Sequence, residues 1–99
     1  MIVTITKSAE SDLERILDAI AASDPRTALA VVRDLRASCP SLSEMPHRYP
    51  LIPGREESGL RRRLHWPYLI LYKALDASVV ILHILHGAMD YEAILFPTD

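Results

Sequence analysis

The stretch from Tyr68 to Leu85, YLILYKALDASVVILHIL, decides the fold, because two apolar runs lie on either side of a short polar turn. Residues 68–75 and 79–85 are rich in β-branched and aromatic residues, and residues 76–78 fit a hairpin turn, so the stretch predicts two adjacent strands. The second run carries apolar side chains on both faces, which favours a central strand. Strict alternation places Val80, Leu82 and Ile84 on one face and Val79, Ile81, His83 and Leu85 on the other.

The segments outside this hairpin predict further strands and a last helix. Upstream, residues 60–66 (LRRRLHW) precede Pro67, so we expect a strand followed by a bend. The first six residues, MIVTIT, are mostly β-branched and predict another strand. Downstream, a short helix is expected to begin at Asp90. In "YLILYK", Tyr68 and Tyr72 share a face, an arrangement more typical of sheet packing than of base stacking.

Two amphipathic helices are expected between the first strand and residue 40. Apolar residues recur at helical spacing over residues 9–20, and Ser8 precedes them as a candidate cap. This stripe is Ala9, Leu13, Ile16, Leu17 and Ile20, with Glu10, Asp12 and Glu14 expected on the outer side. Asp24 and Pro25 fit the N-cap and first residue of a second helix. Its stripe is Ala28, Val32, Leu35 and Cys39. The short break between the two predicts an antiparallel helical hairpin.

The region from residue 40 to residue 59 predicts a loop, because it contains four prolines, two glycines and several polar residues. Loops of this length are uncommon in small domains, so a helical turn is expected between Leu42 and Met45. Neither half of the chain could fold alone. We therefore predict a single domain over residues 1–99, of α+β class, with the order β-α-α-β-β-β and a short C-terminal helix.

Composition excludes several classes of protein. The net charge of −2 weighs against nucleic acid as the main partner, since proteins held by phosphates are clearly basic. No run of apolar residues is long enough to span a membrane, and the N-terminus does not resemble a signal peptide. Cys39 is the single cysteine, so an intrachain disulfide is impossible and the cytoplasm is the expected compartment.

Three segments together resemble the RelE/ParE superfamily of bacterial toxins from type II toxin–antitoxin systems. They are SAESDLERILDAIA near the start, GLRRRLHWPYLILYK in the middle and VVILHILHGAMD near the end, in the order of that family. The combination of Gly59-Leu60-Arg61, Pro67-Tyr68-Leu69-Ile70, Tyr72, His86-Gly87 and Met89-Asp90 carries most of the resemblance. It implies a helical hairpin packed on a small antiparallel sheet.

The resemblance leaves two activities to choose between. RelE-like toxins are ribosome-dependent endonucleases that cut mRNA, whereas ParE-like toxins bind and poison DNA gyrase. RelE-like enzymes carry an arginine where the last core strand ends, and this chain has Met89 and Asp90 at that place. A neutral side chain beside a carboxylate cannot stabilise the charge of a phosphorane. We therefore expect the ParE-like activity, with no catalytic residue and no enzyme activity.

Basic residues on one predicted strand argue for the alternative activity. Arg61, Arg63 and His65 share a face, where two cations beside an imidazole would suit a nuclease. The same face could be solvated charge on an edge strand or a patch that contacts gyrase or the antitoxin. We expect target binding at Arg61, Arg63, His65 and the segment 89–96, with Met89, Asp90, Tyr91 and Phe96 as candidates. The apolar tail either packs on the sheet or serves as docking surface.

The histidines do not form a metal site in the sequence. His83 and His86 are three residues apart, so on a strand they point to opposite faces, and no cysteine lies near them. His83 is expected in the core or on a sheet face with its ring hydrogen-bonded, and His86 in a structural role at the strand end. No metal and no cofactor is expected.

The resemblance implies a cognate antitoxin that folds onto the toxin and forms a hetero-oligomer with it. Two modes of binding fit: an amphipathic helix across the hairpin, or a strand added to a free sheet edge. The candidate antitoxin-binding residues are Leu13, Ile16, Leu17, Ile20, Val32 and Leu35. Sequence-specific nucleic-acid binding and membrane binding are not expected. A degenerate toxin that only binds its antitoxin remains a third possibility.

Overall fold

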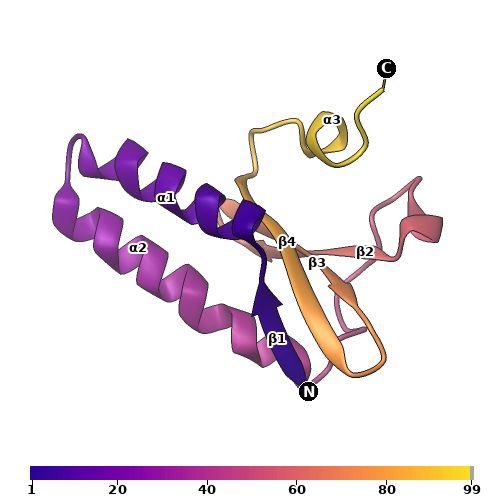
Figure 1. Ribbon diagram of the computed structural model, residues 1–99. Helices are drawn as coiled ribbons and strands as arrows, with labels where there is room; N and C mark the ends of the chain where they lie inside the picture. Colours follow the sequence, from indigo (N-terminus) through magenta and orange to yellow (C-terminus); the bar gives the residue numbers. More distant parts are fainter. Residues whose placement is uncertain (99) are drawn as a thin grey trace.

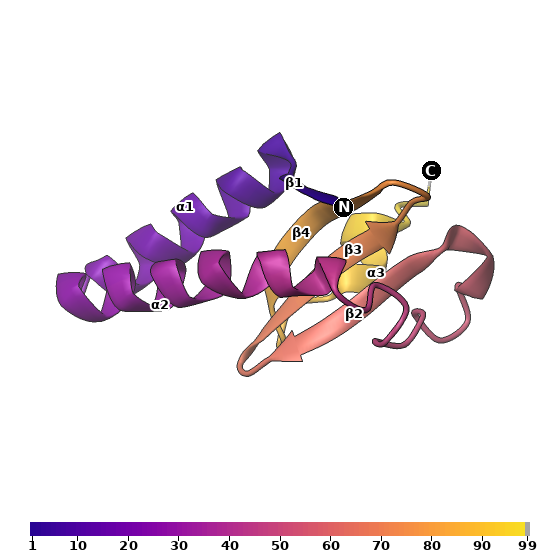
Figure 2. The ribbon, with the colours of Figure 1, turned by 90° about the horizontal axis from the view of Figure 1, so that it is seen from below.

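The computed structural model describes residues 1–98 and places a four-stranded sheet between a helical hairpin and a short C-terminal helix (Figures 1 and 2). The strands are β1 (Ile2–Ile5), β2 (Leu60–His65), β3 (Tyr68–Ala74) and β4 (Ser78–His86). The helices are α1 (Lys7–Ala21), α2 (Pro25–Ser38) and α3 (Tyr91–Leu95), with 3₁₀ helices η1 (Cys39–Ser43) and η2 (Glu56–Ser58) in the long connection. The predicted element order and α+β class are confirmed.

Side-chain caps determine where the two long helices begin. Thr6, not the expected Ser8, caps α1, because its hydroxyl accepts from the Ala9 amide at 3.2 Å and donates to the Ile81 carbonyl at 2.8 Å. The Thr6 side chain therefore both caps the N-terminus of α1 and hydrogen-bonds it to β4. Asp24 caps α2 by accepting from the Thr27 amide at 3.2 Å, as predicted.

The sheet has the order β1-β4-β3-β2, so the two strands of the predicted hairpin occupy its centre. The pairs β2–β3 and β3–β4 are antiparallel, which confirms the expectation for these three strands. β1 pairs with β4 in parallel. A parallel pair needs a long crossover connection, and most of the chain, including the helical hairpin, lies between these two strands.

A β-bulge in β4 overturns the expected division of its faces. Leu71 pairs with His83, but the next residue, Tyr72, pairs with Ile81, so Leu82 is an extra residue in β4. Because of this extra residue, the side chains before and after the bulge do not follow one continuous alternation between the two faces of the sheet. Ile81 and Ile84 therefore both face the hairpin, although strict alternation put them on opposite faces, and Leu82 faces the other side of the sheet.

Two apolar clusters of unequal size lie on the two faces of the sheet. The main core lies under α1 and α2, and its buried members among residues 1–98 are Ala9, Leu13, Leu35, Cys39, Leu42, Tyr68, Ile70, Tyr72, Val79, Ile81 and Ile84. The second cluster lies on the opposite face and consists of Ile52, Leu60, Leu71 and Leu85, partly covered by Tyr91, Leu95 and Phe96. Figure 2 shows α3 and the hairpin on opposite sides of the strands.

Candidate functional site

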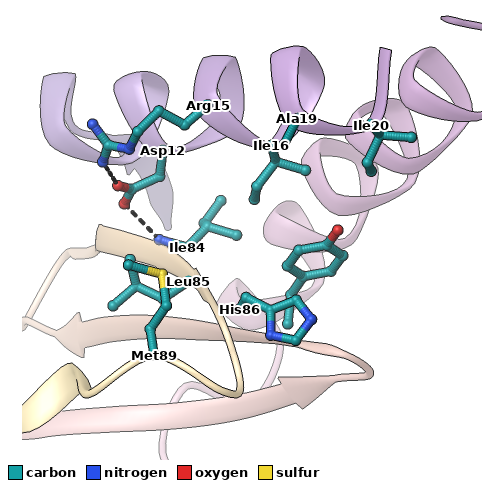
Figure 3. Close-up of a pocket in the computed structure, with 10 residues that line it drawn as sticks. Asp12, Arg15, Ile16, Ala19, Ile20, Ile84, Leu85, His86 and Met89 are labelled. Carbon is teal, nitrogen blue, oxygen red and sulfur yellow. Dashed lines mark hydrogen bonds and ion pairs between the residues drawn. The ribbon is translucent and has the colours of Figure 1, made fainter. Parts of the chain in front are cut away.

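An apolar groove lies between the second half of α1 and the ends of the central strands. It has a volume of about 250 Å³. Its walls are Asp12, Arg15, Ile16, Ala19 and Ile20 from α1, and Tyr68, Ile84, Leu85, His86 and Met89 from the sheet and the turn after β4. Figure 3 shows Ile16 and Ile20 pointing from α1 toward the groove, with Leu85, His86 and Met89 on the opposite wall. An opening of this size and character fits apolar side chains of a partner.

Asp12 positions the two walls of the groove relative to each other. The residue is 2% exposed, and its carboxylate accepts from the Ile84 amide at 2.9 Å and lies 2.8 Å from Nδ1 of His83. Arg15 on the same helix donates to the other carboxylate oxygen (Figure 3). A buried carboxylate with this many partners is satisfied, and it ties α1 to β4.

The expectation that Asp12 points outward was therefore wrong. Residues 9, 12, 13 and 16 lie on one helical face, so the acid occupies the middle of the buried stripe, and this spacing is the signal that could have located it. The expectation for His83 is confirmed, because its ring is half-buried and bound to Asp12. His86 ends β4; its ring accepts from the Ala88 amide at 3.0 Å and makes an edge contact with Tyr68.

The turn that carries Met89 and Asp90 holds no cluster of cations. Met89 is 45% exposed, and Asp90 caps α3 by accepting from the Ala93 amide at 3.3 Å. Within residues 1–98, the only charged side chains that line the groove at Met89 are Asp12 and Arg15, which neutralise each other. A phosphate at this groove would therefore meet no group of unpaired arginines or lysines from residues 1–98.

Arg61, Arg63 and His65 share one face of β2, as predicted, and this face looks toward α2 and η1. Arg61 donates to the carbonyls of His47 and Tyr49, at 3.2 and 2.7 Å. Arg63 donates to the Ser38 carbonyl at 2.9 Å and to the Ser41 hydroxyl at 2.7 Å, at the C-terminal end of α2. His65 lies 2.8 Å from Asp34 on α2. All three side chains therefore join β2 to the hairpin side of the molecule.

The part of the C-terminal segment from Tyr91 to Phe96 does not lie on the same face as these three residues. Tyr91 and Phe96 pack on the second cluster, on the opposite face of the sheet, and Arg55 lies over the Phe96 ring with 4.4 Å to its centroid. Arg62 also faces that side and donates to the Tyr91 hydroxyl at 3.3 Å. The single target surface expected from the sequence is thus divided between two faces, and the tail packs rather than projecting.

The six candidate antitoxin-binding residues differ in accessibility. Leu13 and Leu35 are 1% and 0% exposed, so both belong to the core and cannot contact a partner. The other four are half-buried, namely Ile16, Leu17, Ile20 and Val32. Of these four, Ile16 and Ile20 line the groove.

Burial also makes two reactive side chains poorly suited to act as a proton donor or a nucleophile. Burial raises the pKa of the Tyr72 phenol, which donates to the Pro46 carbonyl at 2.7 Å. Burial likewise raises the pKa of the Cys39 thiol. Neither group is therefore a ready proton donor or nucleophile at neutral pH. No cluster of His, Cys, Asp and Glu suited to a metal occurs among the residues described.

Several exposed residues escaped the sequence reasoning. Trp66 and Leu64 are 82% and 62% exposed near the tip of the β2–β3 hairpin, and the only signal in the sequence was that Trp66 directly precedes Pro67. Arg48 and Arg63 both lie over the Tyr49 ring, at 5.4 and 5.3 Å from its centroid. Nothing in the sequence brings residue 48 next to residue 63. In the part of the chain that the structure describes, no helix is both long and apolar enough to cross a membrane.

Comparison of the sequence and the structure with known proteins identifies a family and two similar structures. The family model of the ParE toxin of type II toxin–antitoxin systems, parDE, matches residues 3–91. A chain of the chromosomal ParDE toxin–antitoxin system from P. aeruginosa has a TM-score of 0.73 at 24% identity, over 87% of this chain and 95% of that one. A chain of the toxin–antitoxin complex RelBE2 from Mycobacterium tuberculosis has a TM-score of 0.60 at 30% identity, over 86% and 95%. A search of curated proteins found no match.

Proposed function

The chain belongs to the ParE toxin family and is a toxin of a type II toxin–antitoxin system, and from this premise we propose that it acts by binding and inhibiting DNA gyrase. A cognate antitoxin neutralises it by binding. Residues 1–99 constitute one toxin domain, which acts in the cytoplasm, where gyrase and its DNA are found. The chain binds its target and does not cut nucleic acid.

The charge distribution at the end of β4 is the single observation that carries this proposal. Cleavage of RNA needs cations around the scissile phosphate and a proton donor nearby. The groove at Met89 offers one arginine, already paired with Asp12, and Asp90 would repel a phosphate. Inhibition by binding requires surface complementarity and no such constellation.

Ribonuclease activity is the second candidate, and two observations favour it. Arg61, Arg63 and His65 do share one face of β2. The relative at 30% identity comes from a complex named RelBE2. Against this activity, the three side chains are bound to carbonyls, a hydroxyl and a carboxylate of the chain itself.

We assign the groove between α1 and β4 to the antitoxin. An amphipathic helix would place apolar side chains between Ile16, Ile20 and Met89, in the helix-in-groove mode of recognition. The volume of about 250 Å³ holds one or two large apolar side chains. The wall is preformed, because Asp12 fixes α1 against β4.

Two assays in parallel test the activity. Purified toxin is added to gyrase with relaxed plasmid, and separately to a translation reaction with a defined mRNA. We expect supercoiling to stop as toxin is raised, with the mRNA intact. Cleavage of mRNA at the ribosomal A site with normal supercoiling would establish the second candidate. Normal supercoiling together with intact mRNA would indicate a degenerate toxin.

Substitution of Ile20 tests the antitoxin site. We expect Ile20→Lys to weaken antitoxin binding about 10-fold or more, because a charge would enter an apolar contact. Leu75→Lys is the matched control, since Leu75 is 46% exposed after β3 and does not line the groove. Binding is measured by calorimetry with the protein encoded by the neighbouring gene. Equal effects of the two substitutions would contradict the assignment.

A further inference from the structure

Two aromatic side chains, Tyr68 and His86, lie next to each other in the sheet wall of the groove. The two residues are direct partners in the antiparallel pairing of β3 with β4, so their side chains share one face of the sheet. Their rings meet edge to face, with 5.6 Å between the ring centroids. Both residues line the groove, and Figure 3 shows the His86 ring on the wall opposite Ile20. The pair therefore faces a ligand that enters between α1 and the strands.

The hydroxyl of Tyr68 has no hydrogen-bond partner within the toxin. Among residues 1–98, the tyrosine hydroxyls that form hydrogen bonds are those of Tyr72 and Tyr91. Tyr68 is nevertheless only 9% exposed and belongs to the main core. No fully enclosed side-chain oxygen or nitrogen of the described residues lacks a partner, so the unpaired hydroxyl must reach an opening, and Tyr68 lines the groove. Buried hydroxyls are ordinarily paired, so this oxygen is available to a ligand.

The ring of His86 supplies an N–H donor of fixed position beside this hydroxyl. Nδ1 accepts from the Ala88 amide at 3.0 Å, so the neutral ring carries its proton on Nε2. The Gly87 amide donates to the Pro67 carbonyl at 2.7 Å and holds the turn after β4 against the residue that precedes Tyr68. A Cβ at residue 87 would lie 3.1 Å from that carbonyl oxygen, so glycine permits this close approach. The two hydrogen bonds position the ring before a ligand arrives.

The remaining walls of the groove favour a neutral ligand over a charged one. The charged side chains in these walls are Asp12 and Arg15, which pair with each other, and the other side chains from α1 are those of two isoleucines and an alanine. A carboxylate between these walls would lose its hydration without meeting an unpaired cation. A primary amide carries no charge, and its carbonyl oxygen accepts two hydrogen bonds. An apolar side chain that ends in an amide therefore matches both the walls and the two donors.

We propose that Tyr68 and His86 determine the specificity of the groove by binding the side-chain amide of a glutamine or asparagine on the helix that occupies it. The carbonyl oxygen of this amide accepts from the Tyr68 hydroxyl and from Nε2 of His86. A helix with leucine at that position would make the apolar contacts but leave both donors unpaired, so it binds more weakly. Only the identity of the helix, as part of the antitoxin, rests on the proposed function. The amide site itself is a property of the free toxin.

Small probes test the amide site without any protein partner. Phenylpropionamide and phenylpropionate, which differ only in their terminal group, are titrated separately into ¹⁵N-labelled toxin and followed by NMR. We expect the amide to shift Nε2 of His86 and to bind at least about 5-fold more tightly than the carboxylate. Tyr68→Phe, which removes only the unpaired hydroxyl, should unfold in urea as the wild type does and weaken amide binding about 5-fold. Tyr49→Phe is the matched control, since Tyr49 also has an unpaired hydroxyl among residues 1–98 but does not line the groove, and it should change the affinity less than about 2-fold.

Calorimetry of the same variants with the protein encoded by the neighbouring gene tests the identity of the ligand. Tyr68→Phe should weaken this complex about 5-fold, and Tyr49→Phe should leave it unchanged. The proposal would be overturned by absence of amide binding, by equal affinity of the amide and the carboxylate, by equal effects of Tyr68→Phe and Tyr49→Phe on the probes, or by a histidine ¹⁵N spectrum with the His86 proton on Nδ1. Amide selectivity in the probes with an unaffected protein complex would overturn the assignment of the amide to the antitoxin. Neither measurement involves gyrase, so a failure of gyrase inhibition is distinguishable from a failure of this inference.

Discussion

The two faces of the sheet are built in different ways. On the hairpin face, two amphipathic helices bury a continuous core in which Leu35, Ile70 and Tyr72 are fully buried. On the opposite face, α3 has five residues and buries none of them completely. Apolar burial supplies most of the stability of small domains. The difference teaches that burial under the hairpin supplies most of the stability of the fold, and that the smaller cluster under α3 contributes less.

Truncation of a core side chain under the hairpin should have the largest effect. Leu35→Ala leaves a cavity among residues that cannot collapse, so we expect a loss of about 3 kcal/mol in the free energy of unfolding. Urea denaturation followed by circular dichroism measures this loss. The control is Leu29→Ala on the same helix, where the side chain is 48% exposed and the change should be within about 0.5 kcal/mol.

Removal of the Asp12 carboxylate should have the second-largest effect on stability. It distinguishes the contribution of hydrogen bonds between α1 and β4 from that of apolar packing. Asp12→Ala leaves the Ile84 amide without its acceptor, so we expect a loss of about 2 kcal/mol. Asp18→Ala, an exposed change on α1, should have almost no effect. An equal, small effect of both substitutions would mean that α1 is held by apolar contact alone.

These two residues also show how far the sequence could predict the fold. The stripe that contains Leu35 has the period of a helix buried on one side, so the hairpin and its core were predictable from spacing alone. Asp12 lies in the same kind of stripe, but an acid is ordinarily solvated, and its burial depends on a backbone amide of β4 seventy-two residues away. Local pattern cannot reveal a partner at that distance.

The candidate site was predictable only in part, for a related reason. Alternation correctly placed Arg61, Arg63 and His65 on one face of β2, because that strand has regular pairing. The same rule failed in β4, where the extra residue Leu82 exchanges the faces, and no residue type in that run marks a bulge. The grouping of Arg61 with Phe96 failed as well, because it depends on which face α3 covers.

A substitution at the end of α3 should give a smaller loss in the free energy of unfolding. It tests directly the comparison between the two faces of the sheet. Phe96→Ala removes the contact with Arg55 and part of the cover over the second cluster, so we expect a loss of about 1 kcal/mol. Hydrogen exchange should show faster exchange in α3, with the central strands unchanged. A loss as large as that of Leu35→Ala would mean that both faces contribute equally to stability.

The ion pair between the two hairpin helices should have the smallest effect, because both partners are exposed. Arg36 donates to Glu10 at 2.6 and 2.9 Å, and this hydrogen bond lowers the pKa of Glu10 below its ordinary value of 4.5. A carboxyl whose pKa is lowered by folding stabilises the native state above that ordinary value and loses this effect as the pH falls through the folded pKa. Solvent screening limits the contribution to about 0.5 kcal/mol.

Comparison of the wild type with Glu10→Gln isolates this contribution, since Asp24, whose pKa is also lowered by its hydrogen bonds with Thr27, is present in both proteins and cancels. We expect the difference in unfolding free energy to be largest at neutral pH and low salt. It should shrink below pH 4.5 and in high salt. A difference that persists in acid would show that residue 10 acts through packing between α1 and α2, and the stability of the hairpin would then be independent of charge.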